Sequence, residues 1–218
     1  RQIASVETLR IEHLEHVLSG RTYEAIEITG GGEPTLHPDI NEIIEKCDWH
    51  APTHLYTNGS LLERVSLFNQ LERLCVSIAH YDLDKNRAIM GVVPDLERLK
   101  DIPVPVKFSL LANRSGIHTA DEIKRYCSWA ASYADSVVIR QLFEHDYRGK
   151  VPAEFVSCEA LFKELQIGDY TKTKHGNPLF SLEGIEVEME YRSCACEVDN
   201  PVLHADGHLY RGWTQERV

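Results

Sequence analysis

The chain has 218 residues, of which 43% are hydrophobic and 26% charged, a balance typical of one globular domain or of a domain with a small appendage. Its formal net charge of −11 disfavours nonspecific binding to nucleic acid, because an acidic surface repels the phosphate backbone. No apolar run approaches the roughly 18 residues of a membrane helix, so we expect no membrane association.

The six cysteines show no disulfide framework. Cys47, Cys75 and Cys127 lie within helix-like or strand-like apolar runs, where cysteine usually acts as a small buried hydrophobe. This usage predicts a reducing, cytoplasmic location. Only Cys194 and Cys196 are closely spaced, and a lone Cys-x-Cys pair is a weak metal signal.

Helix-like and strand-like patterns alternate over the first two thirds of the chain. The strands are expected at residues 23–29, 53–57, 73–79, 104–111 and 136–142. Helices are expected at 7–18, from Pro38 onward, at 61–69, as a broken helix at 84–100, and at 119–133. The last begins with a capping box, Thr119 to Glu122. Five strands alternating with helices predict a parallel α/β sheet of right-handed βαβ units.

After about residue 143 the pattern changes. We expect a short helix at 157–165 and antiparallel hairpins at 176–191 and 202–211, the second turning at Asp206-Gly207. The predicted organisation is therefore a barrel-like domain at 1–143 and a C-terminal α+β extension at 144–218.

Alternation along the strands separates an apolar face from a polar one. Val106, Phe108 and Leu110 oppose Lys107 and Ser109. Arg140 interrupts an apolar strand. A TIM barrel normally fills its interior with branched apolar side chains, so a polar inner face indicates a lumen that holds water or a ligand. Buried Lys107 and Arg140 require anions, either ligand carboxylates or partners such as Glu27.

A glycine-rich turn, Gly30-Gly31-Gly32-Glu33-Pro34, follows the first strand. Glycines expose backbone groups to a ligand because no Cβ blocks the approach. The turn lacks the Gly-Lys-Ser/Thr ending of a phosphate loop, and no GxGxxG fingerprint is present. A carboxylate directly after the glycines suits an ammonium group and would repel a phosphate.

This segment, continued as Thr35-Leu36-His37-Pro38, closely resembles the "GGEP" segment of the radical S-adenosylmethionine (SAM) superfamily. Further segments agree in order and spacing: Thr57-Asn58-Gly59, Val76-Ser77-Ile78, Leu111-Ala112-Asn113-Arg114 and Val138-Ile139-Arg140-Gln141-Leu142. The resemblance covers roughly residues 1–143. It implies a partial (β/α) TIM-type barrel formed by strands two to six of the family's barrel.

The resemblance also implies cofactors and their site. Gly30, Gly31, Gly32, Glu33 and Pro34 would form the site for the methionine end of SAM, with Glu33 and the last two glycines holding it. Polar contacts to the ribose or carboxylate would come from Ser77, Asn113 and Arg140, and the cavity floor from Thr57 and Asn58. The family's four-iron four-sulfur cluster is held by a CxxxCxxC loop, which we expect upstream of Arg1. No metal ligand is assigned within the chain, and an auxiliary cluster on Cys158, Cys194 and Cys196 is not favoured.

The implied activity is that of a radical SAM enzyme, which cleaves SAM reductively to a 5′-deoxyadenosyl radical and removes hydrogen from a substrate. An electron donor such as flavodoxin or ferredoxin is implied with it. The substrate class, whether small molecule, nucleotide or peptide, stays open. The alternative is a degenerate, non-catalytic barrel that acts as a binding module. A plain phosphate-binding domain is a third, weaker interpretation.

Overall fold

The computed structural model describes residues 8–30, 32–142, 151–191 and 200–211. Its centre is an eight-stranded sheet in the order β1-β2-β3-β4-β5-β8-β7-β6. The first six of these strands run parallel: β1 (Ile26–Ile28), β2 (Thr53–Thr57), β3 (Arg73–Ser77), β4 (Val106–Ala112), β5 (Ser136–Gln141) and β8 (Ile185–Glu190). Antiparallel pairing adds β7 (Pro178–Leu182) and β6 (Thr171–Lys172). The predicted α/β architecture with a parallel sheet is confirmed.

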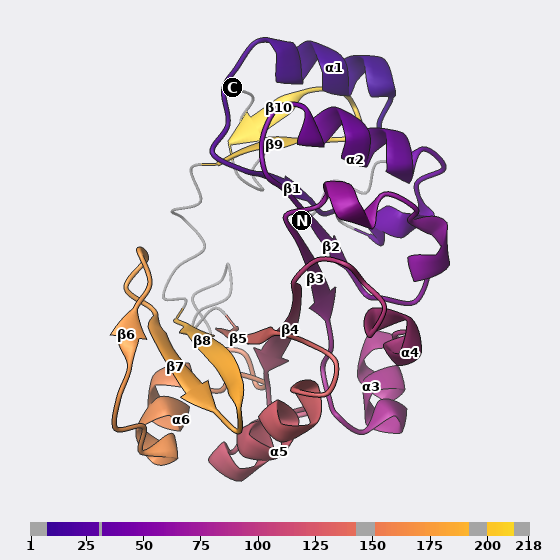
Figure 1. The fold of residues 1–218 in the computed structure, drawn as a ribbon. Coiled ribbons are helices and arrows are strands. Elements are labelled where there is room, and N and C mark those ends of the chain that lie inside the picture. The colour runs from indigo at the N-terminus through magenta and orange to yellow at the C-terminus, as the bar shows by residue number, and fades with distance from the viewer. Residues whose placement is uncertain (1–7, 31, 143–150, 192–199, 212–218) are drawn as a thin grey trace.

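Helices cover one face of the sheet, which follows an arc (Figure 1). They are α2 (Ile40–Asp48), α3 (Leu83–Met90), α4 (Leu96–Leu99), α5 (Ala120–Ala130) and α6 (Cys158–Leu165). The main core lies between these helices and the apolar strand face, which includes the fully buried Leu74, Phe108 and Leu110. The expected division into an apolar and a polar face is therefore present, and helices cover the apolar one.

The sheet continues beyond residue 143, since β8 pairs with β5 in parallel register from Ser136–Glu186 to Arg140–Glu190. Its hairpin partner β7 precedes it, and the two are joined by a tight turn at Glu183-Gly184, where both residues have positive φ angles of 53° and 83°. An exposed ion pair of 3.5 Å joins Lys174, in the β6–β7 turn, to Glu24, just before β1. This contact links the β6–β7 turn to the segment that precedes β1.

A second, two-stranded sheet of β9 (Pro201–Leu203) and β10 (Leu209–Arg211) turns at Asp206-Gly207, as predicted. It lies beside α1 (Ile11–Ser19), as Figure 1 shows. Leu203 packs with Leu14 and Leu18 of α1 in a small separate core. The last described strands therefore return to the N-terminal helix.

The predicted helix at 61–69 is wrong. Two short 3-10 helices, Leu62–Arg64 and Phe68–Gln70, replace it. Asn41 explains the interruption: its amide nitrogen donates to the Arg64 carbonyl at 2.9 Å, and its carbonyl accepts from the Ser66 N–H at 2.7 Å. These are backbone groups that a continuous helix would use internally.

Within the described residues, no helix is long and apolar enough to cross a membrane.

Candidate functional site

The carboxyl ends of the parallel strands meet at one edge of the sheet. This edge is where α/β sheets usually bind ligands. Glu33 follows β1, Thr57 ends β2, Ser77 ends β3, Asn113 follows β4 and Arg140 lies near the end of β5. Five residues that are far apart in the sequence are thus brought to the same edge by the fold.

The Glu33 carboxylate is fixed by four donors. Its Oε1 accepts from the Thr35 N–H at 3.0 Å, the Thr35 hydroxyl at 2.7 Å and the Thr57 hydroxyl at 2.6 Å. Its Oε2 accepts from the Asn58 N–H at 2.7 Å. Since a carboxylate oxygen can accept more than one bond, Oε2 keeps capacity for one further donor. Glu33 therefore joins the turn after β1 to the end of β2 and can still bind a cation.

Thr57 and the turn after it are buried and tightly packed. The Thr57 hydroxyl, 3% exposed, also accepts from the Gly59 N–H at 3.1 Å. Gly59 has a φ of +73°, and a Cβ there would lie 2.9 Å from both Pro94 and Val76. Only glycine fits this position. Packing and backbone conformation within the chain thus explain why residue 59 is glycine, and no ligand is needed for that explanation.

The glycines of the turn after β1 are not explained in this way. Gly30 and Gly32 do not have positive φ angles and are exposed. A Cβ on Gly32 would meet nothing within 4 Å, and one on Gly30 would make only ordinary contacts of 3.7 Å or more. Neither backbone conformation nor packing within the described chain requires glycine here. Gly31 lies outside the described residues.

Pro34 begins the 3-10 helix Pro34–Leu36, which the Glu33 side chain caps. His37 ends it, accepting from the Asp39 N–H at Nδ1 (3.1 Å), so the proton must lie on Nε2. His37 Nε2 then donates to the Leu9 carbonyl at 2.9 Å. This histidine holds the segment before α1 against the turn, which is a structural role.

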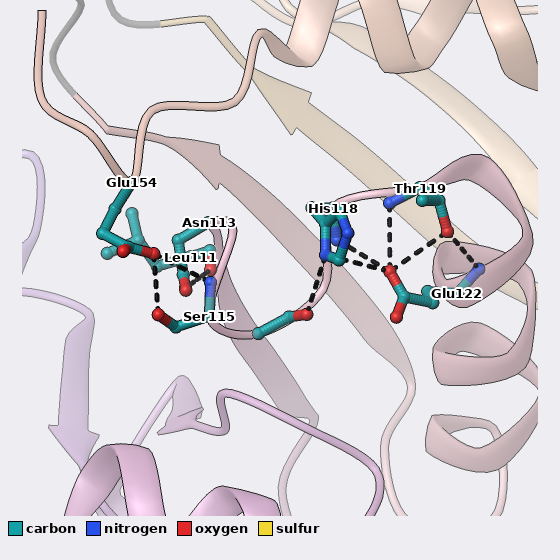
Figure 2. A network of polar contacts seen from close by, with 8 residues as sticks. Leu111, Asn113, Ser115, His118, Thr119, Glu122 and Glu154 are labelled. Carbon is teal, nitrogen blue, oxygen red and sulfur yellow. Dashed lines mark hydrogen bonds and ion pairs between the residues drawn. The ribbon is translucent and has the colours of Figure 1, made fainter.

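Ser77 and Asn113 contribute less clearly than the resemblance implies. Ser77 is half-buried beside Ser109 of β4 and makes no side-chain hydrogen bond to the described residues. Asn113 is 9% exposed and its Nδ2 donates to the Leu111 carbonyl at 2.8 Å (Figure 2). Leu111 itself is 41% exposed, so it offers an apolar surface at this edge.

Arg140 forms an ion pair with a carboxylate of the chain itself. Its Nε donates to Glu190 Oε2 of β8 at 2.8 Å, and the guanidinium lies 5.8 Å from the centre of the Tyr56 ring. Burial acts to lower the pKa of Arg140, but Glu190 and Tyr56 together outweigh it and the pKa is raised. The expected partner Glu27 instead accepts from the Tyr56 hydroxyl at 3.0 Å. Arg140 is thus a fixed cation at the site edge.

Lys107 is paired in the same way, one layer deeper in the lumen. Its Nζ contacts Glu188 Oε2 at 3.0 Å, and Asn177 donates to the other oxygen of that carboxylate at 3.0 Å. Both charged side chains are less than 20% exposed, at 17% and 18%. The polar inner face expected from the sequence is present, and β8 supplies the carboxylates that pair with Lys107 and Arg140.

The described cysteines do not fit an iron–sulfur cluster. Cys47, Cys75, Cys127 and Cys158 are buried and unpaired. Burial raises the pKa of Cys47, Cys127 and Cys158 to about 12, which keeps these thiols protonated, whereas iron is bound by thiolate. Among the described residues no group of three potential metal ligands comes together. Cys194 and Cys196 lie outside them.

These features define a partial (β/α) barrel of mostly parallel strands with a polar inner face and a glycine-rich turn at its carboxyl edge. No family model and no curated protein matches the sequence. Among solved structures, SuiB from Streptococcus suis has a TM-score of 0.55 at 17% identity, over 71% of this chain and 38% of SuiB. TYW1 with a lysine-pyruvate adduct bound has a TM-score of 0.49 at 19% identity, over 70% of this chain and 54% of TYW1. A domain of pyruvate-formate lyase-activating enzyme from Bacteroides vulgatus has 0.46 at 18% identity, over 64% and 91%.

The likeness to SuiB shows the fold of the matched part of the chain. The chain therefore shares the fold of SuiB over the matched residues. It spans 38% of the length of SuiB.

Proposed function

We propose that this chain is the SAM-binding barrel of a radical SAM enzyme. The observation that carries the proposal is the turn after β1. Gly32 has open space around it and a Cβ on Gly30 would make only ordinary contacts, so packing does not require glycine at either position, while the adjacent Glu33 carboxylate is held in place by four hydrogen bonds. A small-residue turn beside a fixed anion suits close approach of an ammonium group such as that of a methionine moiety.

In this proposal the methionine end of SAM lies against the backbone of Gly30, Gly31 and Gly32 and against Glu33 Oε2. Pro34 starts the short helix that places the Glu33 carboxylate, and Thr57 and Asn58 donate to it. Arg140, oriented by Glu190, is a fixed donor for a carboxylate or ribose. Ser77 and Asn113 are the remaining polar contacts at the edge.

When bound beside a reduced four-iron four-sulfur cluster, SAM supplies a 5′-deoxyadenosyl radical for hydrogen abstraction. The described residues provide no ligand set for that cluster. The proposal therefore assigns to them the binding and orientation of SAM and no iron ligand. It also includes a reductant of the flavodoxin or ferredoxin type. A cytoplasmic location is part of it as well, since the buried unpaired cysteines suit a reducing compartment.

The test substitutes Gly32→Val and measures SAM binding by calorimetry. Because the space at Gly32 is open, the fold should keep its stability within about 0.5 kcal/mol, as for an ordinary surface change. SAM affinity should fall at least about tenfold, or 1.4 kcal/mol. Gly168→Val is the matched control, since a Cβ there also meets nothing within 4 Å. Equal SAM affinity in both variants and the unchanged chain would refute the proposed site.

A non-catalytic binding module would pass that test, so a second experiment separates it from the enzyme. The full-length protein is reconstituted anaerobically with iron and sulfide and then reduced in the presence of SAM. Release of 5′-deoxyadenosine supports the enzyme. Tight SAM binding without cleavage supports the binding module.

A further inference from the structure

A groove of about 280 Å³ opens between the loop that joins β4 to α5 and the start of α6. Phe155, Val156 and Leu161 give it an apolar floor. The polar groups around this floor include Arg114 and His118 from the loop and Glu164 from α6. Arg114 directly follows Asn113, so the groove begins next to the edge where we propose that SAM binds.

The two walls of the groove are bonded to each other (Figure 2). The Glu154 carboxylate accepts from the N–H and the hydroxyl of Ser115, both at 2.8 Å. The Glu154 carbonyl accepts from the Arg114 N–H at 3.2 Å. The backbone that carries Arg114 is thus fixed against the segment leading into α6, which makes the groove a feature of the folded chain.

The groove has charges that the described chain does not neutralise. Neither the Arg114 guanidinium nor the Glu164 carboxylate has an ion-pair partner among the described residues. Their neighbours are paired: Lys163 of α6 bonds Glu159 at 2.8 Å. An unpaired cation and an unpaired anion beside one apolar floor are complementary to a molecule with both charges and an apolar body.

His118 also lines the groove. Its Nδ1 lies 3.2 Å from the Gly116 carbonyl and 3.3 Å from Glu122 Oε2 (Figure 2). Both neighbours accept hydrogen bonds, so Nδ1 carries a proton. Glu122 is itself fixed by the capping box with Thr119 at the start of α5. Among the charged groups that line the groove, Arg114 is therefore a hydrogen-bond donor and Glu164 an acceptor.

We propose that this groove binds the substrate, or part of it, as an amino-acid-like zwitterion with an apolar side chain. Its carboxylate pairs with Arg114 and its ammonium group with Glu164. That the bound molecule is a substrate rests on the proposed function, but its binding to the groove does not depend on SAM. The volume is adequate, since roughly 150 Å³ already holds a benzene ring.

The test titrates the full chain, without SAM, with phenylalanine, phenylalaninamide and N-acetylphenylalanine, and follows amide shifts by two-dimensional NMR. Phenylalanine should shift the amides of the groove with saturation. The amide lacks the carboxylate and the acetyl derivative lacks the ammonium group, so each should bind about two- to fivefold more weakly, as expected for partly exposed ion pairs. This ligand series needs no variant.

A variant then locates the carboxylate. Arg114→Gln should lower phenylalanine affinity to that of phenylalaninamide and leave phenylalaninamide binding unchanged. Arg125→Gln, an exposed arginine of α5 outside the groove, is the matched control and should change neither. The inference is overturned if phenylalanine gives no saturable shifts, if both derivatives bind as well as phenylalanine, or if both arginine variants behave alike. A chain that binds SAM but not phenylalanine overturns this inference and leaves the SAM site standing.

Discussion

Replacing Thr57 by valine tests whether Glu33 is held by the end of β2. The change keeps the shape of the side chain and removes one hydroxyl, which donates to Glu33 Oε1 at 2.6 Å and accepts from the Gly59 N–H at 3.1 Å. A bond to a charged acceptor contributes about 1.5–3 kcal/mol, and a buried N–H left without a partner costs about 1–3 kcal/mol. Since valine buries its added methyl group favourably, we expect a net loss of about 2–4 kcal/mol.

Thr53→Val is the matched control. Thr53 lies on the same face of β2, is fully buried, and its hydroxyl donates only to the neutral Ala51 carbonyl at 3.0 Å. That bond is worth about 1 kcal/mol. Urea unfolding should therefore place Thr57→Val about 1–3 kcal/mol below Thr53→Val, with an unchanged denaturant slope. Equal stability of the two variants would show that the Thr57–Glu33 bond does not stabilise the fold.

Two further predictions concern charged groups. Lys107→Met should lower the free energy of unfolding in urea by about 2–4 kcal/mol, because it leaves the Glu188 carboxylate, 18% exposed, without its cation. Adding Glu188→Leu should recover most of this loss. A double variant as unstable as the single one would contradict this prediction. Burial acts to raise the pKa of Glu122, but hydrogen bonds from His118 and Thr119 outweigh it, so the pKa is lowered from its usual 4.5. This carboxylate stabilises the fold above about pH 4.5 and loses that contribution as the pH falls through its lower folded pKa. Glu122→Gln should therefore flatten the acid side of a profile of unfolding free energy against pH. An unchanged profile would contradict this role of Glu122.

Most of the parallel sheet could be predicted because its strands are short apolar runs with strict alternation. In β4, Val106, Phe108 and Leu110 are buried, while Lys107 and Ser109 face the lumen. Local capping chemistry was equally readable, since the Thr119–Glu122 capping box forms as expected. Such features depend on neighbours in the sequence, which a single chain displays directly.

Contacts between distant segments were harder to predict. The helix expected at 61–69 fails because of Asn41, a side chain from another helix. The partners of Lys107 and Arg140 were missed because β5 and β8 are separated by residues 142–184. One signal was available: Glu186, Glu188 and Glu190 alternate with Val187 and Met189, which places three carboxylates on one strand face.

The site itself was recognised through its motif more than through its chemistry. The glycine turn and Glu33 could be identified from their order and residue types, but the four hydrogen bonds that fix Glu33 could not. The groove beside Arg114 had no sequence signal, because its walls come from a loop after β4 and a helix after β5. Whether those walls meet depends on the packing of α6.

The two lumen ion pairs also have a consequence for how the protein is made. Lys107 is synthesised 81 residues before Glu188, and Arg140 is synthesised 50 residues before Glu190. Until β8 leaves the ribosome, a nascent sheet of β1 to β5 has two lumen cations without these carboxylates. Docking of β8 neutralises both at once, which favours folding in which the inner face is completed last. A chain that ends before residue 188 would lack both carboxylates, so its inner face would stay incomplete.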